Sequence, residues 1–413
     1  MMDTENTVYD ISALDNLPEE IDSRAVHIVD NNNYQLYTYK NPKLDDEKRE
    51  TIGIFRSVIT RDDEVLCFSP PKSMSYETFK SSNTDFSKVT SEEFIEGTMI
   101  NLFYDKNKKF PDDRKEEIVD ENRWEITTKS VIGADNQIKN GENTTSFRRM
   151  FLESMIESGL EFHHLNKEYC YSFVVQHPKN RIVKIITKPS LYLIAIYKID
   201  GRIVTDVTKE QRDTLNNYVK FPEKYYFESY DAAQEKYASM DTYYDVVGIM
   251  FKNSQGHRTK LRNPIYEKVK HLRGNNLKLQ FQYMALRQIG KVGNYLKYYP
   301  EDKDAFSKFR DDIHQYTRKL HKNYISCYIK KNKPLVEYDF EYKTHMFKLH
   351  EKFINELRNN GKNVSMEVVI QYVNNLHPAK LMYTLNQPLH KQKRDIVKTN
   401  LENKKNETAE MNK

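Results

Sequence analysis

The spacing of apolar residues changes near residue 265, and this change limits the possible folds more than any other feature of the chain. Between about residue 50 and residue 265, short runs rich in β-branched and aromatic residues alternate with turn residues, as is typical of strands. Beyond this point the apolar residues recur at helical spacing and the strand-like runs disappear. The sequence therefore predicts an α+β domain followed by an all-α domain.

The strand-like part contains one clear hairpin and one helix. Thr51–Ile59 and Glu64–Ser69 flank the turn signal Arg61-Asp62-Asp63, and Ser146–Leu160 shows a helical apolar period with a glycine near its end. Further strands are expected at Thr98–Phe103, Trp124–Ser130, Tyr169–Gln176, Ile182–Ile186, Leu191–Tyr197 and Val246–Phe251. Later helices are expected at Leu277–Tyr298, Asp304–Ile329, Tyr338–Arg358 and Met366–Leu376, the last with Ser365 as N-cap and Pro378 as a break after it.

Four segments follow from this pattern. Residues 1–49 are acidic and rich in turn residues, so we expect a peripheral segment with little committed structure. Residues 50–275 form the expected α+β domain and residues 276–390 the helical one, and the basic, almost apolar-free stretch 391–413 is expected to be disordered. The chain has no membrane-spanning apolar run and no signal peptide, which predicts a cytoplasmic protein without membrane contact.

Positive charge is concentrated in one part of the chain. The net charge is only +5, but the stretch from Arg258 to Lys333 holds 19 Lys and Arg against 6 Asp and Glu, a balance of +13 that leaves −8 for the remainder. Basic residues interleaved with tyrosines suit RNA, whose phosphates and bases need both. A solvated basic face over a tyrosine core is the open alternative. The tyrosines concerned are Tyr283, Tyr295, Tyr298, Tyr299, Tyr316 and Tyr324.

Three segments carry chemistry. Phe94-Ile95-Glu96-Gly97-Thr98 leads into a strand, Phe173 to Val183 is a strand interrupted at Pro178, and Val247-Gly248-Ile249-Met250 is followed by Lys260-Leu261-Arg262. Residues two apart in a strand share a face, so the Lys260 and Arg262 side chains should project together and could hold one phosphate.

Taken in order, these segments resemble the covalent nucleotidyltransferase superfamily, and most closely the bacteriophage-type RNA ligases, over roughly residues 50–275. They align with that family's K-x-D-G-S/T, F-E-F-V-x-P-x-N-R-I-V, E-G-x-V and K-x-K motifs. The resemblance implies an antiparallel-sheet nucleotidyltransferase domain before the helical one. It also implies that nucleotide or RNA is bound by Arg56, Lys72, Glu96, Gly97, Lys129, Arg181, Lys260 and Arg262.

The departures from the family pattern concern catalysis. These ligases form a covalent lysine–AMP adduct, and the position of the lysine nucleophile is here Phe94, whose ring has no lone pair to attack a phosphate. At two positions where the family motifs have an acidic residue, this chain has Val174 and Val247. The sequence therefore predicts no catalytic residue and no metal site, and an RNA-binding pseudoenzyme is the favoured function.

Two alternatives remain open. One is an active ATP-dependent RNA ligase with a displaced nucleophile, such as Lys72 or Lys88, which would use ATP and Mg. The other is a structural or assembly protein with protein partners and an ancestral pocket closed by side chains. The many Asn, Lys, Ile and Tyr residues suit an AT-rich genome, and the resemblance implies a large DNA virus as the source, with the protein in the host cytoplasm or the virion.

Overall fold

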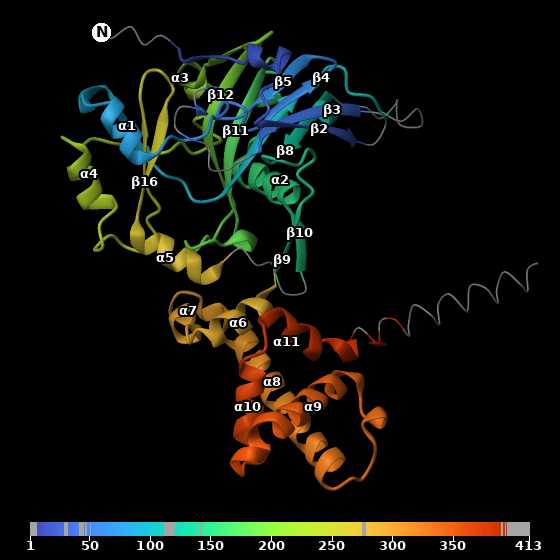
Figure 1. Cartoon of the computed structure of the whole chain (residues 1–413). Coiled ribbons are helices and arrows are strands. Elements are labelled where there is room, and N and C mark those ends of the chain that lie inside the picture. The colour runs from blue at the N-terminus through green and yellow to red at the C-terminus, as the bar shows by residue number, and fades with distance from the viewer. Residues whose placement is uncertain are drawn as a thin grey trace, which may run out of the picture. The chain divides into compact units, whose positions relative to one another are not determined.

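The structure is a computed structural model of the whole chain, and its two compact units are Met1–His271 and Leu272–Lys413 (Figure 1). It describes residues 6–28, 32–40, 45, 48–49, 51–110, 120–140, 143–274, 278–389, 391–392 and 394. Within these residues the first unit combines sheets with helices and the second is helical, which confirms the α+β prediction with a helical C-terminal part. The tail expected at 391–413 lies almost entirely outside the described residues.

A six-stranded antiparallel sheet is the centre of the first unit. Its order is β1 (Val8–Asp10), β13 (Ile203–Asp206), β12 (Ser190–Asp200), β11 (Tyr169–Gln176), β7 (Thr98–Tyr104) and β8 (Trp124–Thr127). Helix α2 (Phe147–Ser158) packs on β11 and β12, with Ser146 as its N-cap and Gly159 in the left-handed region after it. Helix α3 (Thr208–Leu215) also packs on β12. The strands and helix expected here from the sequence therefore form.

The second sheet shows that the expectation of a peripheral N-terminal segment was wrong. β2 (Ile21–Ile28) and β3 (Asn32–Tyr39) pair with each other, and the sheet continues through β4 (Val58–Arg61) to β5 (Glu64–Phe68). Tyr34 and Leu36 of β3 are only 2% exposed. The alternating polar residues of β3 lowered its apparent hydrophobicity, whereas the other face of the strand is buried in a core shared with Phe103 and Tyr197 of the six-stranded sheet. The expected hairpin forms as β4 and β5, with its first strand shorter than expected.

A third sheet borders the site described below. Its antiparallel order is β14 (Lys224–Tyr225), β6 (Thr90–Glu93), β15 (Gly248–Lys252) and β16 (Arg258–Arg262). Helices α1 (Tyr76–Ser82) and α4 (Tyr230–Tyr237) lie beside the β15–β16 hairpin, as Figure 1 shows, and α5 (Pro264–Arg273) follows it. A separate two-stranded hairpin is formed by β9 (Gln137–Asn140) and β10 (Asn143–Ser146). The chain leaves the third sheet at β6 and enters the six-stranded sheet at β7 through Phe94–Gly97.

The second unit consists of α6 (Leu279–Gln288), α7 (Val292–Tyr298), α8 (Lys303–Tyr324), α9 (Phe340–Lys352), α10 (Met366–Asn374) and α11 (Pro378–Leu385). The helix expected over Leu277–Tyr298 is split, because Gly290 adopts a φ of +66°. Ser365 caps α10 as expected, but Pro378 begins α11 instead of only ending a helix, since proline is tolerated at the first helical position.

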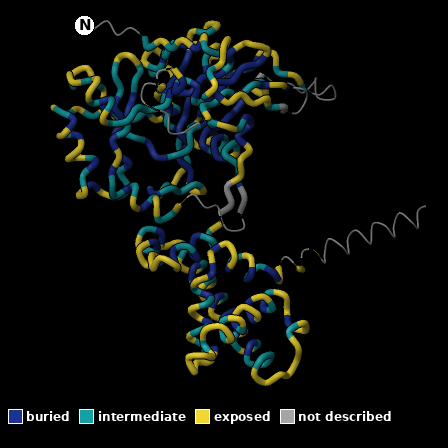
Figure 2. The backbone as a smooth tube through the Cα atoms, in the orientation of Figure 1, coloured by how far each residue is buried: buried dark blue, intermediate teal, exposed yellow. Residues whose placement is uncertain are grey.

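The helices of the second unit have both buried and exposed positions (Figure 2), and burial settles what most of its tyrosines do. Tyr283, Tyr295, Tyr299, Tyr316 and Tyr324 are all 5% exposed or less, so their rings form core and cannot stack on RNA bases. The basic residues on α8 that alternate with them, such as Arg310, Arg318 and Lys322, are exposed. Of the two expectations, the solvated basic face over a tyrosine core is the one that the structure supports. No helix within the described residues is long and apolar enough to cross a bilayer.

Candidate nucleotide-binding pocket

A pocket of about 270 Å³ opens in the first unit where Phe94–Gly97 passes from β6 to β7. Both aliphatic motif positions, Val174 on β11 and Val247 just before β15, lie in its wall. Eight of the residues singled out from the sequence line it together: Arg56, Phe94, Glu96, Gly97, Val174, Val247, Lys260 and Arg262. Tertiary structure thus brings together four segments that are far apart in the sequence, and the space between them is open.

Two glycines allow the strands at this pocket to approach one another. Gly97 has a φ of +152°, and a Cβ there would lie 2.4 Å from the carbonyl oxygen of Val175. Gly248 has a φ of +131°, and its Cβ would lie 2.0 Å from the carbonyl oxygen of Leu261. No side chain can be added at either distance without moving backbone. Gly97 therefore shapes the pocket wall through close packing.

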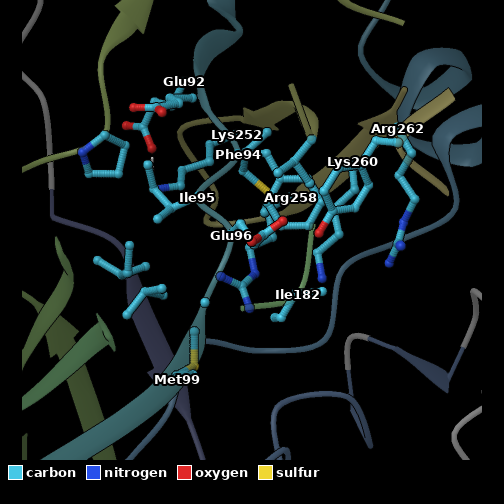
Figure 3. A pocket seen from close by; sticks show the side chains of 18 of the residues that line it. Glu92, Phe94, Ile95, Glu96, Met99, Ile182, Lys252, Arg258, Lys260 and Arg262 are labelled. Atoms are coloured by element: carbon cyan, nitrogen blue, oxygen red, sulfur yellow. Dashed lines mark ion pairs between the residues drawn. The ribbon is translucent and has the colours of Figure 1, made fainter. Parts of the chain in front are cut away.

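Strand β16 supplies a row of cationic side chains. Arg258, Lys260 and Arg262 alternate along the strand, and all three reach the pocket. The Lys260 Nζ lies 5.1 Å and the Arg262 Cζ 5.8 Å from the centroid of the Phe94 ring. Figure 3 shows Phe94 and Lys260 side by side. The ring at the expected nucleophile position therefore contacts the basic groups of Lys260 and Arg262. A cationic group is attracted electrostatically to the face of an aromatic ring.

Three of the pocket cations have no carboxylate partner among the described residues. We call Arg56, Arg258 and Lys260 the cationic cluster. The Arg258 guanidinium donates hydrogen bonds to the carbonyl oxygens of Pro70 (3.0 Å) and Pro71 (2.9 Å), and Arg56 donates to Pro70 at 3.4 Å. These bonds hold the two guanidinium groups in place without neutralising them.

Burial and mutual repulsion shift the protonation of the cationic cluster. The pKa of Lys260 falls from 10.5 to about 6, first through burial and then through the charges of Arg258 and Arg56. The pKa of Arg56 falls to about 10 through burial and the charge of Arg258. Within the described residues, Lys260 has no hydrogen-bond or ion-pair partner. The repulsion among these groups therefore destabilises the protein when the pocket is empty, and an anion that enters the pocket would relieve it.

Arg258 was missed in the sequence analysis, although a signal for it was present. It lies two residues before Lys260 on the same strand, so the spacing that linked Lys260 to Arg262 also applied to it. Its hydrogen bonds to Pro70 and Pro71, and its proximity to Arg56, depend on chain pairing that spacing does not reveal.

Glu96 lines the pocket but its carboxylate is already bound. Its two oxygens accept hydrogen bonds from the backbone N–H groups of Val183 and Lys184, at 3.1 to 3.2 Å. This also explains why the strand expected at Ile182–Ile186 is wrong, because these N–H groups bond to a side chain and not to a neighbouring strand. Glu96 therefore anchors the 182–184 segment at the pocket.

Two of the three other pocket carboxylates are engaged as well. The Lys252 ammonium lies 2.6 Å from Glu92, and Glu267 pairs with Arg262 and, at 3.8 Å, with Lys270. Burial raises the pKa of the Glu93 carboxyl group, and the Glu93 backbone N–H donates a hydrogen bond to the carbonyl oxygen of Glu223 at 2.8 Å. Across the described part of the chain, no group of three or more His, Cys, Asp or Glu side chains could hold a metal ion. The residues present do not fit the Mg that an active ligase would use.

Three expected binding residues lie outside this pocket. The ammonium groups of Lys72 and Lys129 lie 5.0 Å and 4.3 Å from the centroid of the Tyr39 ring at the end of β3, and neither residue lines the pocket. Arg181 donates to the carbonyl oxygen of Val183 at 3.1 Å. The structure therefore divides the expected binding residues between the pocket and neighbouring surface.

Comparison with known proteins points to RNA ligases over part of the chain. The RNA ligase of Rhodothermus phage RM378 is 25% identical over 208 residues, covering 42% of this chain and 44% of the phage protein. The chain thus spans less than half the length of that relative. No protein-family model matches. This sequence similarity supports the expected likeness to an RNA ligase, and a viral source stays a prediction.

Solved structures of ligases are matched with low scores. An archaeal ATP-dependent RNA ligase has a TM-score of 0.37 at 12% identity, over 73% of this chain and 72% of that chain. A putative ATP-dependent DNA ligase from Aquifex aeolicus has a TM-score of 0.37 at 12% identity, over 83% and 79%. A Naegleria gruberi RNA ligase mutant with ATP and Mn has a TM-score of 0.33 at 12% identity, over 57% and 64%.

Proposed function

We propose that this protein binds RNA or a nucleotide through the pocket and has lost the ligase reaction of its relatives. The observation that carries the proposal is the cationic cluster, in which the Lys260 amine has no hydrogen-bond or ion-pair partner among the described residues while two fixed guanidinium groups repel its charge. Two fixed guanidinium groups beside a buried lysine are costly to maintain without a ligand, and a phosphate group would offset that cost and favour the protonated form of Lys260. The similarity to a phage RNA ligase supports nucleic acid as the source of the phosphate.

Loss of catalysis follows from the side chains at the motif positions. Phe94 cannot form a bond to phosphorus, and the aliphatic Val174 and Val247 are 6% and 8% exposed in the pocket wall. A lost nucleophile removes the covalent pathway itself, whereas a lost acid or hydrogen-bond donor lowers a rate. The open volume between these residues argues against the alternative of a pocket closed by side chains.

Salt dependence of RNA binding tests the proposal. Each phosphate neutralised on a single strand contributes about −0.7 to the slope of log affinity against log salt, so three contacts predict a slope of about −2. Lys260→Met should weaken binding and make the slope less steep by about 0.7. Lys106→Met is the matched control, because Lys106 is exposed and pairs with Glu64 on the surface. Fluorescence anisotropy with a short single-stranded RNA measures both, and absence of binding at low salt would refute the proposal.

One observation favours a second function, an active ligase with a displaced nucleophile. The low pKa of Lys260, which burial causes, leaves a neutral amine beside Phe94 at pH 7. It could attack the α-phosphorus of ATP, forming a P–N bond while the bond to pyrophosphate breaks and an amine proton passes to water. Lys72 and Lys88, the substitutes expected from the sequence, are not among the pocket-lining residues.

Covalent labelling separates the two functions. The chain is incubated with ATP labelled at the α-phosphate, with and without Mg, and then denatured and resolved by electrophoresis. Label that stays on the wild-type chain and disappears in Lys260→Met would establish the displaced nucleophile. An unlabelled wild-type chain that still binds RNA leaves the binding function alone.

A further inference from the structure

We propose that the pocket binds the phosphate of a single nucleotide unit without a divalent metal, with the cationic cluster in the place that a metal would take. The inference rests on the proposed function and adds a property that the likeness to a ligase does not imply, since an active ligase of this type would use Mg.

Four glutamates line the pocket, so a metal could bind there only if one of their carboxylates were available. Mg²⁺ in phosphate-binding sites is held by one or two carboxylates together with the phosphates. At two positions where the family motifs have an acidic residue, this chain has the aliphatic Val174 and Val247. The Glu96 carboxylate already accepts hydrogen bonds from two backbone N–H groups. Two of the remaining carboxylates pair with lysines or an arginine, and burial raises the pKa of the third, Glu93, which favours its neutral form. Each carboxylate among the described lining residues is therefore paired, hydrogen-bonded or shifted toward the neutral form, and a neutral carboxyl group is a poor metal ligand.

The positive charge of the pocket also opposes a metal and favours a bare phosphate. A divalent cation would lie against Arg56, Arg258 and Lys260, and like charges repel strongly where water is partly excluded. The same groups suit phosphate oxygens, because guanidinium forks donate two hydrogen bonds at once and an ammonium adds a compact charge. The carbonyl oxygens of Pro70 and Pro71 hold the guanidinium of Arg258, so it needs little reorganisation.

The volume limits what can enter. About 270 Å³ lies just below the roughly 300–1,000 Å³ typical of small-molecule sites, which suits one nucleotide unit and excludes a duplex. The Phe94 ring contacts the cations of Lys260 and Arg262 and so helps to place them. A phosphate of a single strand, or of a free mononucleotide, is the ligand class that fits.

The direct test compares RNA binding in excess EDTA with binding in millimolar MgCl₂ at equal ionic strength. The probe is a single-stranded RNA of about 12 nucleotides, which is within the length that single-strand sites cover, and AMP is tested in parallel by calorimetry. Affinities within about threefold in the two buffers support the inference. Binding that appears only with Mg overturns the inference and leaves the proposed function standing, whereas no binding in either buffer removes the proposed function itself.

A variant adds an independent arm. Val174→Glu returns a carboxylate to the pocket and is expected to weaken binding in EDTA about tenfold, with Mg restoring it. Val174→Gln is the matched control that has the same size without the charge, and it should bind equally in both buffers. Binding of Val174→Glu in EDTA that is as tight as that of the wild type contradicts the inference, because an added carboxylate should repel the phosphate. If either variant fails to fold, the wild-type comparison decides alone.

Discussion

Replacing Lys260 by methionine should make the protein more stable, by an amount that depends on pH. The pKa of Lys260 is lowered from 10.5 to about 6 in the folded chain, first by burial and then by Arg258 and Arg56. Between these two values the unfolded chain binds a proton that the folded chain does not, so the wild type loses stability as the pH falls from 10.5 toward 6. Methionine carries no charge and removes this loss.

The size of the gain follows from the same shift. pH 7 lies about 3.5 units below the ordinary lysine pKa, which at about 1.36 kcal/mol per unit corresponds to about 5 kcal/mol. Lys260 is only partly buried, and solvent screening reduces the expected gain to about 2–3 kcal/mol. Because the proton difference persists down to the folded pKa, the gain should be about 1–2 kcal/mol larger at pH 6 than at pH 8. It should stop growing below pH 6.

Urea unfolding followed by tryptophan fluorescence measures this gain. Trp124 is the only tryptophan of the chain and is 3% exposed in the first unit, so its emission reports the unit that contains the pocket. The control is Lys106→Met, which should change the free energy of unfolding by less than about 1 kcal/mol at each pH. A Lys260→Met variant that is less stable than the wild type, or whose gain is equal at pH 6 and pH 8, would refute the reasoning.

Three further changes have defined outcomes. Asp105→Asn should lower the free energy of unfolding in urea by about 3–5 kcal/mol, because it leaves the buried Arg61 without its ion pair. Asp231→Asn loses only an exposed pair with Lys80 and should lower it by less than about 1 kcal/mol. Equal losses in the two variants would contradict this. Gly97→Ala should lower the free energy of unfolding by about 1–3 kcal/mol and so lower the melting temperature. Gly293→Ala, whose Cβ meets open space, should not lower it. Phe94→Lys should acquire no covalent label from ATP, because Val174 and Val247 remain aliphatic, and a labelled band would show that the nucleophile alone was missing.

Much of the fold could be predicted because strands and helices leave local periodic signals. Tyr169–Gln176 and the helix near Ser146 have such signals and form where expected. β3 escaped prediction because its polar residues alternate with the buried Tyr34 and Leu36 in a turn-rich setting. Ile182–Ile186 was wrongly expected to be a strand because local composition cannot reveal that the Glu96 carboxylate takes its N–H groups.

The sequence by itself determined the chemistry of single positions and the shared faces of single strands. Phe94 has no nucleophile in any fold, and Lys260 and Arg262 share a face because alternation along a strand is a local property. Only the tertiary structure brought Arg56 to Arg258 and Lys260, and only it placed Lys72 and Lys129 at Tyr39. The physical reason is that contacts between distant segments depend on which strands pair and in what register, and one sequence's spacing does not encode that pairing.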